Sequence, residues 1–403
     1  QLSRLYQRKH NLPESIIPKV EDLHKADPAI PQIYMAGYEF MKHLIADQAT
    51  DKRLARKRCV FLLRNPIDVT VSLYFHVLKH ATRERKLFND WPLDLTATSI
   101  MEFATTSHWG LMKVISFYNS CLRHAAALPH AHVALWDGIV MGGGMGLSQG
   151  IALRVVTERT QMAMPETQIG LFPDVGGGYF LSRCPGNTGE YLALTGQLLR
   201  GAESLSVGLA DVYVDSKSLH SIWDGLQTKS WKHGDEVVAW VKEQANASTP
   251  SSAPSKPTWW DTRIDSVFRL PTVHDIVDAL GQLVLKEPEG WAADTLKALR
   301  QRSPLLLAVS LEQIRRGRTM GLSDELRMER DMVRHCFHLE HLSRRGAQTD
   351  TAEGIRALVI DKDRKPKWQP ASIEEITPEM VKPFFQSPWP TAMHPLRHLV
   401  DTF

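Results

Sequence analysis

Two acidic residues eight positions apart, Glu166 and Asp174, are the side chains of this sequence best suited to acid–base or nucleophilic chemistry. Three glycines precede them at residues 142–144, and three more follow at residues 176–178. Because glycine lacks a Cβ, its backbone N–H groups can approach a ligand closely. Such N–H groups beside two carboxylates could stabilise an enolate or a tetrahedral oxyanion, so we expect chemistry on an acyl thioester.

Each of these features also has a purely structural interpretation. A glycine-rich turn between a strand and a helix can bind a dinucleotide or a phosphate, or can simply allow tight packing. Glu166 could cap a turn or a short helix, and Asp174 could form an Asx turn before Gly176. The combination of both acids with both glycine runs favours a catalytic site.

Three segments carry a resemblance to a known family: residues 137–144, residues 164–178 and residues 353–363, the last of which continues to Trp368. In this order they resemble the crotonase (enoyl-CoA hydratase/isomerase) superfamily, and within it the 3-hydroxyisobutyryl-CoA hydrolases. The resemblance covers roughly residues 131–400. It implies hydrolysis of a short hydroxyacyl-CoA thioester in branched-chain amino-acid (valine) breakdown.

The resemblance also assigns roles to individual residues. Gly143 donates its N–H to the oxyanion, and Gly142 lines the substrate site with it. Glu166 either attacks the thioester or activates water, and both alternatives stay open; Asp174 assists. Coenzyme A is part of the substrate, so we expect no separate cofactor. A mitochondrial location is implied, with the cytoplasm and the peroxisome as alternatives, although no targeting segment is visible.

One position separates the hydrolases from the hydratases of the superfamily. Hydratases carry a second acid two residues after the glycine triplet and use it with the first to hydrate a double bond. That position is Gly146 in this chain. The sequence therefore favours a hydrolase over a hydratase.

Residues 1–122 do not resemble the first half of a crotonase domain, which supplies a second oxyanion donor. The loss of one such donor costs about 10²- to 10³-fold in rate, so an impaired fusion or fragment is one alternative. Residues 59–76 instead resemble the 3′-phosphate-binding segment of sulfotransferases, with Arg64 and Ser72 as the phosphate-binding residues. A sulfotransferase using 3′-phosphoadenosine 5′-phosphosulfate is the second alternative, although the loop for the phosphosulfate group is absent.

The elements that must position these residues follow from hydrophobic pattern and punctuation. We expect a buried strand at 133–136, a helix at 144–153 and one or two strands within 154–164. Ser303 before Pro304 predicts a helix that ends at Gly317, and another helix begins at Ser323. The fold class is α/β: an incomplete crotonase-type ββα core and a C-terminal helical region follow a partial P-loop-type α/β segment. The expected domains are residues 1–122 (sulfotransferase-like), 123–247 (crotonase-like core), 248–257 (linker) and 258–403 (helical region).

Composition gives no positive indication of a nucleic-acid, membrane or metal partner. The 403 residues contain 48 basic and 45 acidic side chains, and a formal charge of +3 does not indicate a nucleic-acid partner. No run of 18 apolar residues predicts a membrane span. The four cysteines are far apart and the histidines lack ligand spacing, so we expect reduced buried thiols and no metal site. The C-terminal helices are expected to form a packing layer or a homo-oligomer interface.

Overall fold

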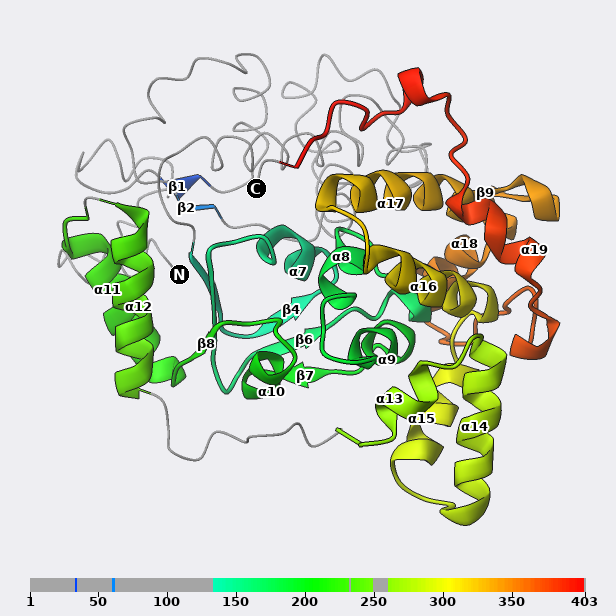
Figure 1. The fold of residues 1–403 in the computed structure, drawn as a ribbon, viewed down its shortest axis with the longest axis horizontal. Helices are drawn as coiled ribbons and strands as arrows, with labels where there is room; N and C mark the ends of the chain where they lie inside the picture. Colours follow the sequence, from blue (N-terminus) through cyan, green and yellow to red (C-terminus); the bar gives the residue numbers. More distant parts are fainter. Residues whose placement is uncertain (1–32, 35–59, 62–132, 232, 249–259, 402–403) are drawn as a thin grey trace, which may run out of the picture. The chain divides into compact units, whose positions relative to one another are not determined.

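The computed structural model describes residues 33–34, 60–61, 133–231, 233–248 and 260–401 (Figure 1). The chain divides into two units, residues 1–130 and residues 131–403. In the first unit the described residues form two short parallel strands, β1 (Ile33–Tyr34) and β2 (Val60–Phe61). All three segments that resemble the crotonase superfamily lie in the second unit.

The second unit contains two small three-stranded sheets. The first has the order β3-β5-β8, formed by β3 (Val133–Trp136), β5 (Leu153–Val156) and β8 (Val212–Tyr213), all parallel. The second has the order β4-β6-β7, formed by β4 (Ile139–Met141), β6 (Gln161–Ala163) and β7 (Leu199–Arg200). β4 and β6 are parallel, whereas β7 is antiparallel to β6. The strands β3, β4, β5 and β6 thus alternate between the two sheets along the chain.

The strands expected at 133–136 and within 154–164 are confirmed, but the helix predicted over 144–153 is too long. Helix α7 (Gly143–Ser148) ends five residues before β5 begins at Leu153. Leu153, Val155 and Val156 are fully buried, because β5 is the central strand between β3 and β8. Because β5 pairs with a strand on each side in the sheet, its β-branched and apolar residues are more stable there than as an extension of the helix.

A helical layer covers the β3-β5-β8 sheet. Helices α11 (Leu219–Thr228) and α12 (Gly234–Ser248) lie side by side next to β8 (Figure 1). Their apolar faces meet the sheet in a small core of Leu153, Val155, Val214, Ile222, Val241 and Ala245. Ser248 ends α12, and residues 249–259, which include most of the predicted linker, lie outside the described residues.

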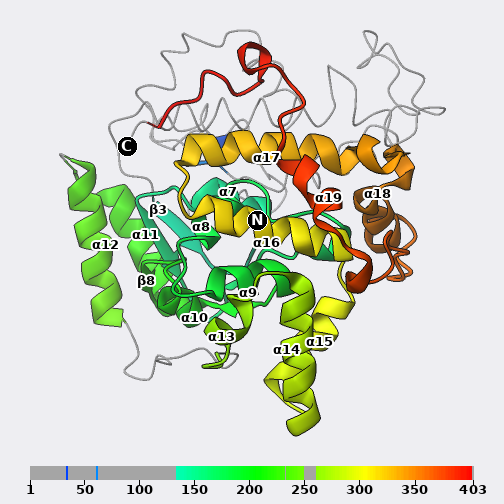
Figure 2. The same cartoon turned by 45° about the vertical axis from the view of Figure 1, so that its right-hand side comes forward.

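The expected C-terminal helical region is confirmed over residues 264–337. It contains α13 (Ile264–Phe268), α14 (Val273–Lys286), α15 (Trp291–Arg300), α16 (Pro304–Gly317) and α17 (Leu322–Phe337), shown from a second side in Figure 2. The Ser303 hydroxyl accepts a hydrogen bond from the Leu306 N–H at 3.2 Å, as the predicted N-cap. α16 packs against α8 (Gly177–Leu181) and α9 (Thr188–Thr195), and so joins this region to the core.

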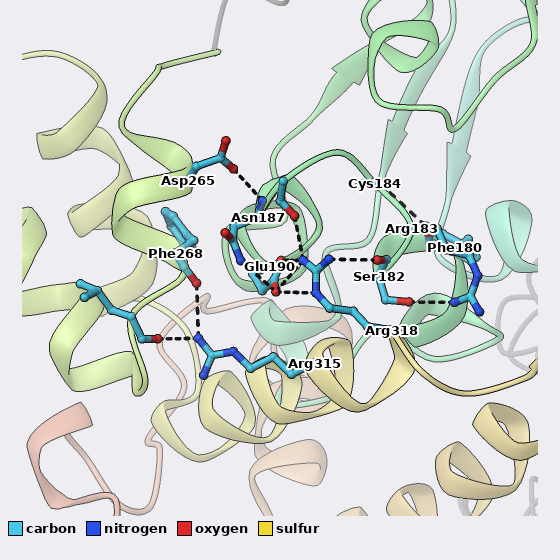
Figure 3. Close-up of polar contacts among 12 residues, drawn as sticks. Phe180, Ser182, Arg183, Cys184, Asn187, Glu190, Asp265, Phe268, Arg315 and Arg318 are labelled. Atoms are coloured by element: carbon cyan, nitrogen blue, oxygen red, sulfur yellow. Dashed lines mark hydrogen bonds and ion pairs between the residues drawn. The ribbon is translucent and has the colours of Figure 1, made fainter.

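A buried ion pair fixes the end of α16 to the core. Arg318, the C-cap of α16, binds the carboxylate of Glu190 on α9 at 2.7 and 2.8 Å (Figure 3). The Glu190 side chain is 1% exposed and the Arg318 side chain 35%. A second polar contact joins α13 to α9: Asp265 of α13 accepts a hydrogen bond from the N–H of Asn187, the N-cap of α9, at 2.7 Å. Polar contacts therefore tie α9, α13 and α16 together.

Beyond α17 the chain forms short elements and turns. These are β9 (His338–Leu339), η5 (Glu340–Leu342), β10 (Arg344–Arg345), η6 (Gly346–Gln348), α18 (Asp350–Ile355), η7 (Arg356–Ile360), η8 (Ile373–Glu375), α19 (Pro378–Val381), η9 (Lys382–Phe385) and η10 (Thr391–Met393). Arg356 forms ion pairs with Glu353, Asp361 and Asp363 at 2.6–2.8 Å. The family-like segment 353–363 thus folds around one arginine.

Two further observations concern the described residues alone. No helix among them is long and apolar enough to cross a membrane. Cys184 and Cys336 are buried free thiols, as expected, whereas Cys59 and Cys121 lie outside the part of the chain that the structure describes.

Candidate active site

The parallel pairing of β4 and β6 brings the two sequence motifs together. Met141 and Ala163 are register partners at the carboxyl ends of these strands, so the segments that leave the strands start side by side. The Gly142 N–H donates to the Ala163 carbonyl at 3.1 Å and extends this pairing by one residue. Ligand sites in α/β folds lie characteristically at this edge of a sheet.

Glu166 begins the short helix η3 (Glu166–Ile169), three residues after β6. Its side chain lies against Gly142: a Cβ placed on that glycine would be 2.7 Å from Glu166 Oε1. Glu166 is 7% exposed, and its Oε2 has no hydrogen-bond partner among the described residues. Burial, and secondly the charge of Asp174, raise the pKa of Glu166 well above its usual value.

Asp174 lies in the loop between η3 and α8. Val175 has a φ of 56° and Gly176 a φ of 87°, so the loop takes two consecutive left-handed residues immediately after the acid. The Gly177 N–H donates to the Asp174 carbonyl at 2.9 Å and closes this turn. Burial raises the pKa of Asp174 to about 6. Two acids that influence each other's ionisation at one sheet edge are typical of acid–base sites.

The two glycines of the candidate substrate site occupy different backbone positions. Gly142 precedes α7 with φ 49° and ψ −118°, a conformation that a residue with a Cβ adopts only with strain, and its N–H is taken by Ala163. Gly143 is the first residue of α7, where a backbone N–H has no partner within the helix. No other hydrogen bond involves this N–H among the described residues, so the predicted oxyanion donor is not consumed by the sheet.

Gly146 explains why this site holds no acid at the hydratase position. A Cβ on Gly146 would lie 2.3 Å from Val175 Cγ2 and 2.4 Å from the Val175 carbonyl oxygen. Both distances are below any allowed contact, so a side chain at residue 146 would displace the loop that carries Asp174. The absence of a second acid follows from close packing between α7 and this loop.

Sequence reasoning missed two more buried acids beside the Asp174 loop, Glu325 and Glu329 on α17. Glu325 falls in the first turn of the helix predicted to begin at Ser323, where an acid is favourable for the helix alone, and Glu329 belongs to no local motif. A signal was present, because Glu325 and Glu329 share the face of α17 that buries Met332 and Cys336. Acids on the apolar face of a helix indicate a polar site within the core.

Arg64 and Ser72, the predicted phosphate-binding residues of the sulfotransferase-like segment, lie outside the described residues. The structure therefore brings together Gly142, Gly143, Glu166 and Asp174, and does not describe the other two. Within the described ranges no group of three His, Cys, Asp or Glu side chains could hold a metal ion.

Comparison with known proteins finds relatives over most of this chain. A family model described as enoyl-CoA hydratase/isomerase matches residues 116–385. A probable 3-hydroxyisobutyryl-CoA hydrolase 2 of Arabidopsis thaliana is 42% identical over 256 residues, 63% of this chain and 65% of the relative. A mitochondrial 3-hydroxyisobutyryl-CoA hydrolase of Rattus norvegicus is 38% identical over 264 residues, 65% of each chain. The chain thus spans about 65% of the length of these relatives.

Among solved structures, an enoyl-CoA hydratase from Rhodobacter sphaeroides 2.4.1 has a TM-score of 0.54 and 32% identity, with 67% of this chain and 72% of that chain covered. None of the relatives named here is a sulfotransferase, so the sulfotransferase-like interpretation of residues 1–120 gains no support from them. The family model spans both sheets, both glycine runs and all of α16 and α17. With the crotonase-type fold and its sheet-edge acids in place, this chain belongs to the enoyl-CoA hydratase/isomerase family.

Proposed function

We propose that this chain hydrolyses the thioester of a short hydroxyacyl-CoA, of the 3-hydroxyisobutyryl type, in valine breakdown. The observation that carries the proposal is the contact between Gly146 and Val175, which leaves no room for the second hydratase acid while Glu166 and Asp174 remain at the site. The relatives named as 3-hydroxyisobutyryl-CoA hydrolases support the choice of substrate.

The proposed chemistry uses three groups of the chain. The Gly143 N–H stabilises the negative charge on the thioester oxygen, since it carries no intrahelical hydrogen bond. Glu166, held against Gly142, attacks the carbonyl carbon or removes a proton from an attacking water. Asp174, close enough to raise the pKa of Glu166, assists at the hydroxyacyl end or at the water. The carbon–sulfur bond breaks, water supplies the new carboxyl oxygen, and coenzyme A leaves as the thiol.

Raised pKa values suit this role. Burial raises the pKa of Asp174 to about 6, so Asp174 can exchange a proton near neutral pH, and burial also raises the pKa of Glu166, which makes its ionised form a stronger base than an ordinary carboxylate. No separate cofactor is needed in this scheme, because coenzyme A enters with the substrate. A homo-oligomer formed through the C-terminal helices stays a prediction.

The experiment is a release assay for free thiol with 3-hydroxyisobutyryl-CoA and the full chain. Glu166→Gln should lower kcat by about 10²- to 10⁴-fold, while hydration of crotonyl-CoA stays negligible in both proteins. Glu312→Gln, the same substitution at a half-exposed position paired with Arg316, is the matched control and should leave the rate unchanged. Thiol release that survives Glu166→Gln, or faster hydration than hydrolysis, would contradict the proposal.

Location forms a separate part of the proposal. The Rattus norvegicus relative is named mitochondrial, which supports a mitochondrial location for this chain. Fractionation of cells that express the full-length gene, followed by immunodetection, should recover the protein with a mitochondrial matrix marker. Recovery with cytoplasmic or peroxisomal markers would overturn this part alone.

A further inference from the structure

Glu325 and Glu329 lie one turn apart on α17 and face the loop that carries Asp174. Glu325 is 0% exposed and Glu329 5% exposed. Neither forms an ion pair with a lysine, arginine or histidine in the described part of the chain, and Glu325 Oε2 has no hydrogen-bond partner there. Buried acids without a cation are costly, so a structural role alone does not account for two of them.

The two acids, with Gln313 of α16, hold the loop by its backbone. The Gly176 N–H donates to both carboxyl oxygens of Glu329, at 3.0 Å each. Gln313 Nε2 donates to the Pro173 carbonyl at 2.8 Å and lies 3.4 Å from one oxygen of each acid. Both backbone groups lie within two residues of Asp174. These contacts thus fix the backbone of the loop on both sides of the proposed catalytic acid.

The fit between the loop and the acids is close. A Cβ on Gly178 would lie 2.2 Å from Glu325 Oε1 and 2.9 Å from Gln313 Nε2. Only glycine at residue 178 therefore lets the carboxyl group of Glu325 reach the loop. The glycine run at residues 176–178, expected to serve the ligand, in fact accommodates the two acids of α17.

The surroundings of the pair favour a proton shared between its two acids. A single amide nitrogen, Gln313 Nε2, lies 3.4 Å from an oxygen of each carboxyl group, so the two groups are close enough to affect each other's ionisation. Burial raises the pKa of Glu325 to about 7 and that of Glu329 well above its usual value, and Asp174 acts in the same direction on both. The charged groups that face the pair are Asp174 from the loop and Arg183, which follows α8 and favours ionisation of Glu325; α16 contributes the neutral Gln313.

We propose that Glu325, Glu329 and Gln313 form a proton-sharing clamp that positions the Asp174 loop, and that loss of the shared proton releases the loop. Two ionised carboxylates in contact, with Asp174 beside them, repel one another strongly in a poorly solvated interior. Glu325 and Glu329 are positioning residues, and their effect on catalysis, though not the clamp itself, rests on the proposed function.

Hydrogen–deuterium exchange of the full chain tests the clamp without any substrate. After correction for intrinsic rates, the peptide that covers residues 173–178 should be protected at about pH 6 and should lose that protection at about pH 9. Glu325→Gln and Glu329→Gln keep a neutral hydrogen-bonding group in place and should stay protected at both pH values. Glu329→Leu removes the acceptor of Gly176 and should exchange about 10- to 100-fold faster at both.

The controls separate this inference from the proposed function. Glu312→Gln on α16 should behave as the unmodified protein does. If the thioesterase is active, the alkaline fall of kcat should disappear in Glu325→Gln with KM unchanged. A chain without thioesterase activity can still show the exchange pattern, and then only the proposed function fails. The clamp would be overturned if the unmodified protein showed equal protection at both pH values. It would also be overturned if both Gln variants lost protection at alkaline pH. Neither outcome depends on whether Glu329→Leu folds.

Discussion

The acids around the Asp174 loop and three acids elsewhere in the second unit have opposite surroundings. Glu166, Asp174, Glu325 and Glu329 have no lysine or arginine partner among the described residues. Elsewhere in the second unit, three buried or half-buried acids are paired with arginines: Glu190 with Arg318, Asp350 with Arg344, and Glu353 with Arg356. Both regions bury carboxyl groups, but only one neutralises them.

The difference appears in the direction of the pKa shifts. Hydrogen bonds from Arg356 hold the pKa values of Glu353 and Asp363 below their usual range. Burial without a cation raises the pKa values of Glu166 and Asp174. An acid fixed in one charge state stabilises the fold, whereas an acid that titrates near neutral pH can transfer a proton. The lack of an arginine ion pair on Glu166 and Asp174, among the described residues, fits the proton transfer proposed for them.

The largest effect is expected where an arginine is removed from the helical region. Arg318→Met leaves the buried Glu190 without its ion pair, and should lower the free energy of unfolding by about 3 kcal/mol. Thermal unfolding followed by circular dichroism measures the loss. The double variant Arg318→Met with Glu190→Gln should recover part of it, because the orphaned charge is gone. No recovery would show that Arg318 acts through packing instead of charge.

At the site, by contrast, a substitution is expected to raise the free energy of unfolding. Because burial raises the pKa of Asp174 from 3.8 to about 6, the native state keeps a proton that the unfolded chain has lost between these pH values. The contribution of Asp174 to stability therefore falls as the pH rises through this window, and stays low above it. Asp174→Asn should be more stable than the unmodified protein by about 2–3 kcal/mol at pH 7, and by less at pH 4.5.

The same thermal scans at both pH values check this prediction. Asp265→Asn, on α13, serves as the matched substitution in the helical region, where its carboxylate accepts a backbone N–H at 2.7 Å. That variant should lose stability at pH 7. If Asp174→Asn were destabilised to the same extent, the contrast between the two regions would not hold.

A smaller effect should follow from filling the space between α7 and the Asp174 loop. Gly146→Ala places a methyl group 2.3 Å from Val175 Cγ2, so the loop must move, at a cost of about 1–3 kcal/mol. Gly144→Ala on the same helix meets only Val140 Cγ1 at 3.7 Å and should be neutral or slightly stabilising. Thiol release should fall in the first variant and persist in the second. Equal effects would mean that the packing of residue 146 does not shape the site.

The smallest effect is expected at Arg356. Its partners Asp361 and Asp363 are about half exposed, and water and salt screen such pairs. Arg356→Gln should lower the midpoint of thermal unfolding less than Arg318→Met does, and high salt should abolish the difference. A loss that is as large as that of Arg318→Met and insensitive to salt would assign this surface cluster a role in the core.

The sequence alone determined what depends on local interactions. The strand β3, the Ser303 cap and the end of α16 at Gly317 follow from hydrophobic period, capping chemistry and glycine as a stop, all of which act within a few residues. The glycine runs and the two acids, Glu166 and Asp174, were visible for the same reason: a motif is a local pattern. The predicted length of this helix, residues 144–153, was wrong because the pairing of β5 with β3 and β8 is not local.

Only the tertiary structure decided how these parts act together. The register of β4 with β6 places Glu166 against Gly142, and close packing of the loop explains why residue 146 is glycine. Glu325 and Glu329 follow Asp174 by some 150 residues, so no local pattern connects them with it, and their role depends on the packing of α17 against α8. Burial sets the ionisation of all four acids, and burial exists only once distant segments have packed together.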